Sequence, residues 1–302
     1  MPNPRYRGRF APSPTGPLHA GSMLAALGSW LLARQAGGEW LLRIEDIDPP
    51  REVAGAADAQ LQALAGFGLR HDGEIARQSR RGHLYRAALN QLMAQGLAFE
   101  CHCSRAELAA AGGIHRRCVA TAPRPDPAIR LRVPDGCEIA FEDAVHGRVV
   151  QRVDRDVGDF VLLRTDGLWA YQLAVVVDDA EQGITDVVRG ADLLDSTPRQ
   201  ILLQRALGLP TPRYAHLPLL LGEDGKKLSK SDAALPVDSE DPLRTLRMLW
   251  HRLGQAPLAA DAIRSTAVFL DATVPAFRLE RVPRQAQPLS AAVHNESATS
   301  RV

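Results

Sequence analysis

The chain has 302 residues, of which 45% are apolar, so it can bury a full α/β core together with a smaller insertion. Its formal net charge is +1, which excludes a strong overall basic field, although 36 lysines and arginines leave RNA binding open. The sequence contains no run of about 18 apolar residues and no apolar signal-peptide core. We therefore expect a cytoplasmic protein without a membrane span. Separately, we expect it to act as a monomer.

The first part of the chain alternates strand and helix patterns. A strand is predicted at Arg5–Ala11, and a turn rich in proline separates it from a helical pattern at Met23–Ala33. The almost continuously apolar segment Glu39–Glu45 predicts a second strand, of the kind that is buried in parallel sheets. Helical patterns follow at Val53–Leu64 and His83–Gln95.

The middle of the chain changes to short apolar runs. Those between Ile129 and Val153 are separated by Pro-Asp-Gly and His-Gly and predict small antiparallel strands, which we interpret as an insertion between two halves of a parallel sheet. Beyond Pro283 the composition has no periodicity and predicts a loose tail. The remaining strands are predicted at Phe160–Leu163, Tyr171–Val177, Ile184–Val188 and His216–Leu221, and the remaining helices at Ser196–Leu207 and Pro242–Leu253.

The turn that follows the first strand indicates phosphate binding. Gly21 lets the backbone come close to a ligand, and His19 stands at a helix start, where the helix dipole favours negative charge. The alternative is that His19 only caps the helix or packs against it.

A second basic motif, Lys226–Ser231, lies in a polar loop after a predicted strand. Its ammonium groups can neutralise the charge that develops on a pyrophosphate. Considered alone, a run of lysines is as readily a solvated basic loop.

Together the two motifs resemble the signatures of a known family. The stretch from Pro12 to Ser22 resembles the HIGH signature, and Lys227–Ser231 resembles the KMSKS signature, of class I aminoacyl-tRNA synthetases. The resemblance extends from about Arg5 to about Leu253. Three further segments are similar to the glutamyl/glutaminyl branch, particularly its glutamate-specific members: Arg9–Gly16, Leu42–Asp46 and Asp186–Gly190.

The resemblance implies a domain organisation and a reaction. The fold would be a Rossmann-like parallel sheet without an anticodon-binding helical domain, and the chemistry would be ATP-dependent formation of glutamyl-adenylate. The ranges expected are 1–98 and 156–235 for the halves of the catalytic domain, 99–155 for a zinc-binding insertion, 236–282 for a short helical extension and 283–302 for a flexible tail.

The same resemblance implies the nucleotide site. His19 and Lys230 would be the leading catalytic contacts, with Lys227 second and Mg²⁺ accompanying the nucleotide. The expected ATP-binding residues are Pro12, His19, Gly21, Lys227 and Lys230.

Glutamate carries two carboxylates and one ammonium, so its pocket needs cationic groups and an acid. Arg189 is expected to bind the α-carboxylate, and Arg9 with Tyr171 the side-chain carboxylate. The full expected set is Arg9, Phe10, Ala11, Pro12, Ser13, Glu45, Tyr171 and Arg189, in which Ser13 and Glu45 meet the amino group. Alternatively, Glu45 and Arg189 form an ordinary ion pair and Tyr171 packs in the sheet.

Three cysteines and a histidine suggest a metal site. Cys101, Cys103, His115 and Cys118 offer the ligands of a tetrahedral structural Zn²⁺. In short relatives of the family the third ligand is a tyrosine after Gly-Gly-Ile, whereas His115 stands there in this chain and is one residue nearer to Cys118. His102 competes for that place, and buried free cysteines with a surface histidine are the alternative.

From Ser231, the last residue of the lysine motif, to Val302 the sequence has only 72 residues. The anticodon-binding region of a full-length glutamyl-tRNA synthetase needs more than this. This and the cysteines resemble glutamyl-queuosine tRNA(Asp) synthetases, which attach glutamate to queuosine in the anticodon of tRNA(Asp) after a tRNA-independent activation. The implied partners are L-glutamate, ATP and the queuosine-carrying anticodon stem-loop of tRNA(Asp). The candidate contacts to RNA phosphates are Arg77–Arg86, Arg116, Arg117, Arg130 and Arg132. The alternative is that these residues belong to solvated faces of the protein.

Three alternatives stay open. One is a fragment of an ordinary glutamyl-tRNA synthetase, and another is a glutamate-activating paralogue with a non-tRNA acceptor. The third is an inactive paralogue that only binds RNA or a partner, which the intact Arg9, His19, Glu45, Arg189 and Lys230 disfavour.

Overall fold

The computed structural model describes residues 5–222, 237–238, 240–259 and 263–289. The strands are β1 (Arg7–Phe10), β2 (Glu39–Ile44), β3 (Ala76–Arg77), β4 (Ala98–Cys101), β5 (Ala128–Leu131), β6 (Glu138–Asp143), β7 (Gly147–Arg152), β8 (Phe160–Leu163), β9 (Asp186–Gly190), β10 (Arg213–Leu217), β11 (Leu220–Leu221) and β12 (Gln287–Pro288). The helices are α1 (Ala20–Gln35), α2 (Ala56–Gly66), α3 (Gly82–Ala94), α4 (Arg105–Ala110), α5 (Val153–Asp156), α6 (Tyr171–Glu181), α7 (Thr197–Leu207), α8 (Pro242–Arg252) and α9 (Thr266–Ala276). Short 3-10 helices are η1 (Pro49–Arg51), η2 (Gln78–Arg80), η3 (Ala191–Ser196) and η5 (Leu279–Arg281).

The main sheet has 7 strands in the order β3-β2-β1-β9-β10-β6-β7. Neighbouring strands from β3 to β6 pair in parallel, and only β7 runs antiparallel to its neighbour. Strand β1 has β2 on one side and β9 on the other, so the direction in which strands are added to the sheet reverses between β1 and β9. In open α/β sheets, ligands bind beyond the carboxyl ends of the strands at such a switch point. The predicted Rossmann-like α/β fold is confirmed.

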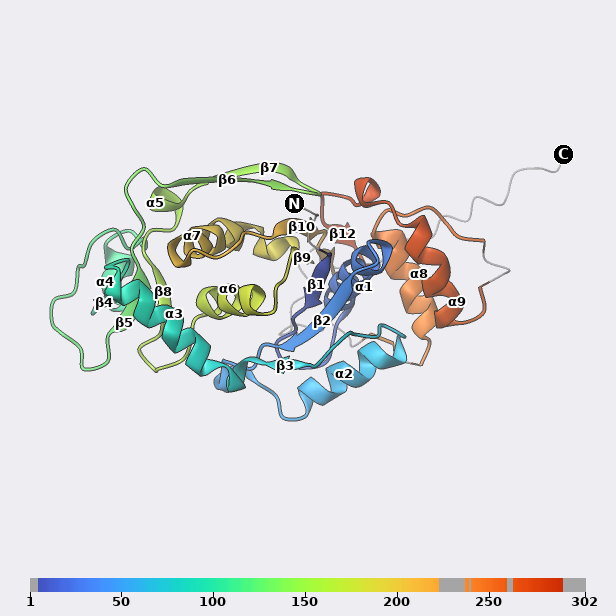
Figure 1. Cartoon of the computed structure of the whole chain (residues 1–302), viewed down its shortest axis with the longest axis horizontal. Helices are drawn as coiled ribbons and strands as arrows, with labels where there is room; N and C mark the ends of the chain where they lie inside the picture. The colour runs from blue at the N-terminus through green and yellow to red at the C-terminus, as the bar shows by residue number, and fades with distance from the viewer. Residues whose placement is uncertain (1–4, 223–236, 239, 260–262, 290–302) are drawn as a thin grey trace.

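The two faces of the sheet are covered by different helices, because successive side chains of a strand point to opposite faces. Val188 and Ala215 belong to the buried cluster on the face of α1, whereas Val187 and Tyr214 belong to the cluster that includes α3, α6 and α7. Helix α1 packs on β1, β2 and β9, and α8 and α9 pack on α1 (Figure 1). The sheet is therefore held between two layers of helices.

Helix α1 approaches the sheet closely because of a glycine. A Cβ added at Gly28 would lie 2.5 Å from Cδ1 of Leu217 on β10, well inside van der Waals contact. The helix is buried over most of its surface, with Met23, Leu27 and Leu31 fully buried. Its apolar sequence follows from its position between the sheet and α8–α9.

One predicted strand is wrong. The segment Tyr171–Val177 is the first part of α6, which continues to Glu181. Its residues from Leu173 to Val177 are all buried. A short apolar run without polar interruption has the same sequence pattern in a buried strand and in a buried helix, so periodicity alone does not separate them.

The small strands between Ile129 and Val153 divide between two sheets, which differs from the single insertion expected. Strand β5 pairs with β4 and β8 in a 3-stranded antiparallel sheet, at one end of the molecule beside α4 (Figure 1). The hairpin β6–β7 instead joins the main sheet, where Asp143 pairs with Tyr214 of β10. The ranges 99–155 and 156–235 stay a prediction, and β5 and β8 pair across their boundary.

The segment predicted as a loose tail is partly ordered. Gln287–Pro288 forms β12 and pairs in parallel with β11, while residues 290–302 lie outside the described residues. Strand β11 is separate from β10, although His216–Leu221 was predicted as one strand. Among the helices of the described ranges, none combines the length and apolar character that crossing a membrane requires.

Candidate functional site

A cleft of about 820 Å³ lies beyond the ends of β1, β2, β9 and β10. All the predicted glutamate- and nucleotide-binding residues that the structure describes line it: Arg9, Phe10, Ala11, Pro12, Ser13, His19, Gly21, Glu45, Tyr171 and Arg189. Lys227 and Lys230 lie outside the described residues. The tertiary structure thus brings together positions separated by up to 180 residues of sequence, since Arg9 and Arg189 stand on the neighbouring strands β1 and β9.

At one end of the cleft, His19 is the N-cap of α1. Its Nδ1 accepts a hydrogen bond from the backbone N–H of Ser22 at 3.2 Å, and its Nε2 lies 3.0 Å from the Ser22 hydroxyl. A Cβ at Gly21 would lie 3.1 Å from two atoms of the imidazole ring, so the glycine makes room for that ring. The capping role considered from the sequence is present, and the same side chain also lines the cleft.

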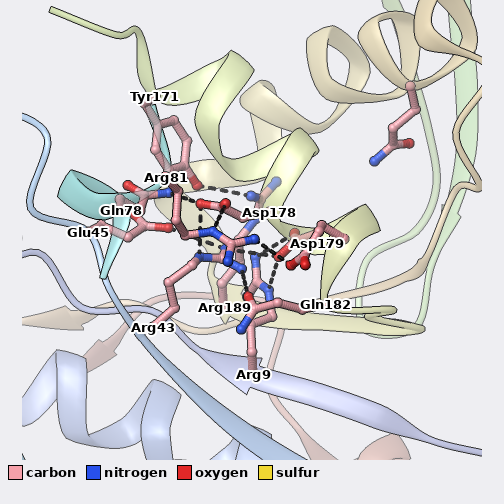
Figure 2. Close-up of polar contacts among 12 residues, drawn as sticks. Arg9, Arg43, Glu45, Gln78, Arg81, Tyr171, Asp178, Asp179, Gln182 and Arg189 are labelled. Atoms are coloured by element: carbon pink, nitrogen blue, oxygen red, sulfur yellow. Dashed lines mark hydrogen bonds and ion pairs between the residues drawn. The ribbon is translucent and has the colours of Figure 1, made fainter. Parts of the chain in front are cut away.

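Arg9 forms a bidentate ion pair with Asp179 of α6. Its Nε lies 3.0 Å from Oδ1 and its Nη2 lies 3.2 Å from Oδ2, and both side chains are buried. Arg43 adds a second guanidinium 2.8 Å from Oδ1 of Asp179. Burial raises the pKa of Asp179, but Arg9 and Arg43 outweigh this effect, so the pKa lies below its ordinary value. Figure 2 shows these arginines converging on the aspartates of α6.

The preceding residue, Asp178, lies 3.7 Å from the shared Arg43, but its other partners differ from those of Asp179. It accepts a hydrogen bond from Gln78 at 2.7 Å and pairs with Arg81 (Figure 2). It also accepts a hydrogen bond from the Tyr85 hydroxyl at 2.7 Å. Because Gln78 lies in η2, Tyr85 in α3 and Arg81 between them, Asp178 ties α6 to this part of the chain, while Asp179 contacts the cleft-lining Arg9.

Glu45 follows β2 and is buried at the edge of this cluster, with its Oε1 3.4 Å from Nη2 of Arg43. Burial raises its pKa to about 7, against the opposing influence of Arg43 and Arg9. The ordinary ion pair between Glu45 and Arg189 that the sequence left open is not among the ion pairs of the described residues. The carboxyl group is therefore poised to ionise when a cation comes close.

Arg189 on β9 is held by neutral acceptors. Its Nη2 donates to the Thr197 hydroxyl at 2.8 Å and to the Leu193 carbonyl, and its Nη1 lies 3.2 Å from the Tyr171 hydroxyl. Its Nε donates to Nε2 of His216 at 3.1 Å. Among the described residues, no carboxylate forms an ion pair with Arg189. Its positive charge thus remains for an anionic ligand.

A second group of functional side chains lies away from the cleft. The ligand atoms of Cys101, Cys103 and His115 all lie within 4.8 Å of one another, and all three residues are buried. Cys118 is exposed, and its sulfur lies 3.6 Å from that of Cys103. Three of the predicted metal ligands therefore form one group, and Cys118 reaches that group at Cys103.

The histidine in this group is oriented by a carboxylate. Nδ1 of His115 lies 2.9 Å from Oδ2 of Asp159, and Nε2 is buried without a hydrogen-bond partner. An orphaned buried nitrogen beside two thiols is the donor arrangement that a bound Zn²⁺ would satisfy. His102, the competitor, instead accepts a hydrogen bond at its Nδ1 from the backbone N–H of Arg124. His115 therefore lies beside the cysteines, whereas Nδ1 of His102 is occupied by a backbone N–H.

Several arginines predicted as phosphate contacts have partners within the protein. Arg77 pairs with Asp58, Arg116 donates to the Arg155 carbonyl and Arg130 to the Asp159 carbonyl. Arg86 and Arg132 stack over Trp169 and Phe99. These contacts orient the side chains without removing their charge.

The sequence did not reveal several buried polar residues that support the cleft, among them Asp143, Asp178, Asp179 and His216. The only local signal was the pair of aspartates directly after the apolar run that was predicted as a strand. Two adjacent acids at the end of a buried segment need buried cations, and Arg9 and Arg43 were available. Asp143 and His216 carry no comparable signal, because they meet only when β6 joins β10.

Comparison with known proteins agrees with this arrangement. A family model described as tRNA synthetases class I (E and Q), catalytic domain, matches residues 5–127 and 116–254. A glutamyl-Q tRNA(Asp) synthetase of Xanthomonas campestris is 64% identical over 281 residues, which cover 93% of this chain and 94% of that protein. A protein of the same name from Pseudomonas aeruginosa is 51% identical over 92% of this chain and 96% of its own length.

Among solved structures, a glutamate tRNA ligase from Elizabethkingia meningosepticum in complex with its amino acid superimposes with a TM-score of 0.79. The two sequences are 30% identical, and the match covers 95% of this chain and 67% of that one. The named relatives and the shared fold make this protein an enzyme of the ligase class. The chain belongs to the class I glutamyl- and glutaminyl-tRNA synthetases and, within them, to the family whose members are named glutamyl-Q tRNA(Asp) synthetase.

Proposed function

We propose that this enzyme activates L-glutamate with ATP, without tRNA, and transfers the glutamyl group to the queuosine base at the wobble position of tRNA(Asp). The observation that carries the proposal is the presence of Arg9, Glu45 and Arg189 in one cleft. Two guanidiniums and one carboxyl group complement the two carboxylates and the ammonium of glutamate. The names of the relatives support the choice of acceptor.

Glutamate would be bound by groups that are already in place. Only Nε and Nη2 of Arg9 donate to Asp179, so donors on Nη1 remain for the substrate's side-chain carboxylate. Arg189 would hold the α-carboxylate, with Tyr171 beside both arginines. Glu45, with Ser13, would accept the ammonium, and the approach of that cation would favour the ionised form of Glu45.

The activation step needs no nucleophile from the protein. An oxygen of the glutamate α-carboxylate attacks the α-phosphorus of ATP, the bond to the β-phosphate oxygen breaks, and pyrophosphate leaves. His19 would donate a hydrogen bond to the phosphoryl oxygens near the N-terminus of α1, with Pro12 and Gly21 shaping that end of the cleft. Lys227 and Lys230 would neutralise the leaving group. Mg²⁺ bound with ATP would reduce the negative charge of the phosphates.

In the transfer step, a hydroxyl of the acceptor attacks the carbonyl carbon of glutamyl-adenylate. An ester bond forms, the bond between that carbon and the phosphate oxygen breaks, and AMP leaves with the electron pair, while the phosphate takes up the proton that the hydroxyl loses. The enzyme would act here by positioning, since the acyl adenylate is already activated.

We also propose that the cysteine group holds one structural Zn²⁺. Cys101, Cys103 and Cys118 would supply thiolates, and His115 would supply Nε2 while Nδ1 donates to Asp159. The ion would tie β4 to the segment that carries His115 and Cys118, and that segment forms a β-bridge between His115 and Gly158.

The test is a labelling experiment with the purified chain, ATP, Mg²⁺ and radiolabelled glutamate. Parallel reactions receive tRNA(Asp) with queuosine, tRNA(Asp) without it, and tRNA(Glu). We expect label only on the queuosine-containing tRNA(Asp). Label on tRNA(Glu) would contradict the proposed acceptor, and adenylate formation with no labelled tRNA would redirect the search to a different acceptor.

A further inference from the structure

Arg189 is contacted by a buried histidine–aspartate pair to which the proposed reaction assigns no chemical step. His216 and Asp143 are both fully or nearly fully buried, and Nδ1 of His216 lies 2.6 Å from Oδ2 of Asp143. On the other side of the ring, Nε2 lies 3.1 Å from Nε of Arg189 and 3.2 Å from the Thr197 hydroxyl. A chain of contacts therefore runs from Asp143 through His216 to Arg189.

The donors in this chain define one tautomer of His216. An arginine Nε carries a hydrogen and has no lone pair, so Nε2 of His216 must be the acceptor. The ring proton then lies on Nδ1 and is donated to the Asp143 carboxylate. Protonation of both ring nitrogens would place an N–H against the N–H of Arg189.

The other oxygen of Asp143 is also fully used. Oδ1 accepts hydrogen bonds from the backbone N–H groups of Val145 at 3.0 Å, His146 at 2.9 Å and His216 at 3.3 Å. These bonds fix the carboxylate at the turn of the β6–β7 hairpin and aim Oδ2 at His216. The hairpin, which joins the main sheet beside β10, thereby supports the arginine on β9.

The arrangement orients Arg189 without neutralising it. Asp179 contacts Arg9 directly and takes up two of its donors, whereas Asp143 is separated from Arg189 by a neutral imidazole. A carboxylate placed directly against Arg189 would compete with a carboxylate of the substrate for the same guanidinium. An intervening neutral histidine holds the guanidinium plane and leaves its charge for the ligand.

We propose that Asp143 and His216 are positioning residues that hold Arg189 for the α-carboxylate of glutamate. The inference rests on the proposed function, since it assigns the ligand of Arg189. Neither residue lines the cleft, so neither touches the substrate. Their effect should appear in the binding of glutamate and not in the binding of ATP.

Two substitutions of His216 separate its two nitrogens. Glutamine places an amide oxygen near the position of Nε2 and keeps an acceptor for Arg189, whereas asparagine reaches only the position of Nδ1 and loses that acceptor. The matched control is His251→Asn, the same substitution at an exposed histidine of α8.

Asp143→Asn tests the tautomer of His216. Its oxygen must serve the three backbone N–H groups, so its NH₂ group faces Nδ1 and drives the ring proton to Nε2, against Arg189.

The experiment measures glutamate-dependent ATP–pyrophosphate exchange with radiolabelled pyrophosphate on the full chain. We expect His216→Asn and Asp143→Asn to raise KM for glutamate by about tenfold or more, with KM for ATP within about twofold of wild type. His216→Gln should recover most of the loss, and His251→Asn should match wild type. Thermal unfolding identifies any variant that fails to fold, and the other substitution then carries the test.

Equal changes in both KM values, or no change in KM for glutamate in folded His216→Asn and Asp143→Asn, would overturn the proposal. Loss of affinity in His216→Gln as large as in His216→Asn would also overturn it, because the acceptor would then be irrelevant. Absence of glutamate-dependent exchange in the wild-type enzyme is a different result, since it contradicts the proposed activity before any variant is compared.

Discussion

Asp179 accepts two hydrogen bonds from Arg9, at 3.0 and 3.2 Å, and both side chains are buried. The second charge in the pocket, Arg189, has no such carboxylate among its described partners and is held by a neutral histidine. The two arginines on adjacent strands are thus supported in different ways. This difference sets the expected effects of substitution.

Asp179→Asn should weaken both the fold and the binding of glutamate. The substitution leaves Arg9 and Arg43 buried with too little negative charge, and breaking a buried ion pair costs on the order of 3 kcal/mol or more. KM for glutamate in pyrophosphate exchange should rise by about tenfold or more, because Arg9 is no longer held. Urea unfolding and exchange kinetics measure the two effects.

The control for this prediction is Asp58→Asn, at a carboxylate that is 72% exposed and pairs with Arg77. An exposed ion pair contributes about 0–1 kcal/mol, so stability and exchange should stay near wild type. If Asp179→Asn were as mild as Asp58→Asn, the buried pair would not be what positions Arg9.

The affinity for glutamate should depend on pH through Glu45. Its pKa is raised to about 7, so the carboxyl group is ionised above that pH and protonated below it. Only the ionised form attracts the ammonium of the substrate, and the dissociation constant for glutamate should rise as pH falls below about 7, by up to about tenfold per unit. Calorimetric titration of glutamate between about pH 5.5 and pH 8 measures this dependence.

The raised pKa of Glu45 makes folding stability depend on pH in the opposite direction to the affinity for glutamate. The unfolded carboxyl ionises near its ordinary value of 4.5, while the folded one stays protonated up to about 7. Its contribution to stability is therefore fully present below the unfolded pKa and is lost as pH rises through the folded pKa. Glu45→Gln should remove both dependences, and a variant that kept the wild-type pH profile of glutamate binding would assign the titration to another group.

Zinc binding should require His115 and not His102. Nε2 of His115 is buried without a partner beside Cys101 and Cys103, whereas Nδ1 of His102 is already hydrogen-bonded to a backbone N–H. We expect one Zn²⁺ per wild-type chain and per His102→Ala chain, measured by mass spectrometry of the metal. Loss of a hydrogen-bond partner of a metal ligand lowers metal affinity by about 10–100-fold. His115→Ala removes the ligand itself and should lower the zinc affinity by more than this.

Asp159→Asn provides the intermediate case. It weakens the contact that orients His115 but keeps all four ligands, so its zinc affinity should fall about 10–100-fold in competition with a chelator. Zinc retained by His115→Ala and lost by His102→Ala would reverse the assignment.

A pair of glycines tests the packing of α1 against the sheet. Gly28→Ala places a Cβ 2.5 Å from Leu217 and should destabilise the protein by about 1–3 kcal/mol. Gly66→Ala, at the end of α2, meets nothing within 4 Å and should stabilise it by about 0.5–1 kcal/mol. Thermal and urea unfolding should show opposite signs. Two changes of the same sign would mean that α1 adjusts its distance from β10.

Local sequence patterns determined the strand at β1, the buried strand at β2 and most helices, because apolar periodicity and turn residues act over a few positions. His19, Glu45 and Arg189 were recognised through the resemblance of their motifs to class I synthetases, and in the structure each stands near the end of a strand or the start of a helix. The cysteine spacing predicted the grouping of Cys101, Cys103 and His115.

The tertiary structure decided what no local pattern records. The segment Tyr171–Val177 is a helix because it packs on α7 and α3, and its apolar run alone fitted either structure. The burial of Asp178 and Asp179 is possible only because arginines from β1, β2 and η2–α3 reach them. Asp143 and His216 are 73 residues apart and meet only because β6 pairs with β10. Sequence specifies the groups that can bind a ligand, but pairing between distant strands selects which buried charges hold them in place.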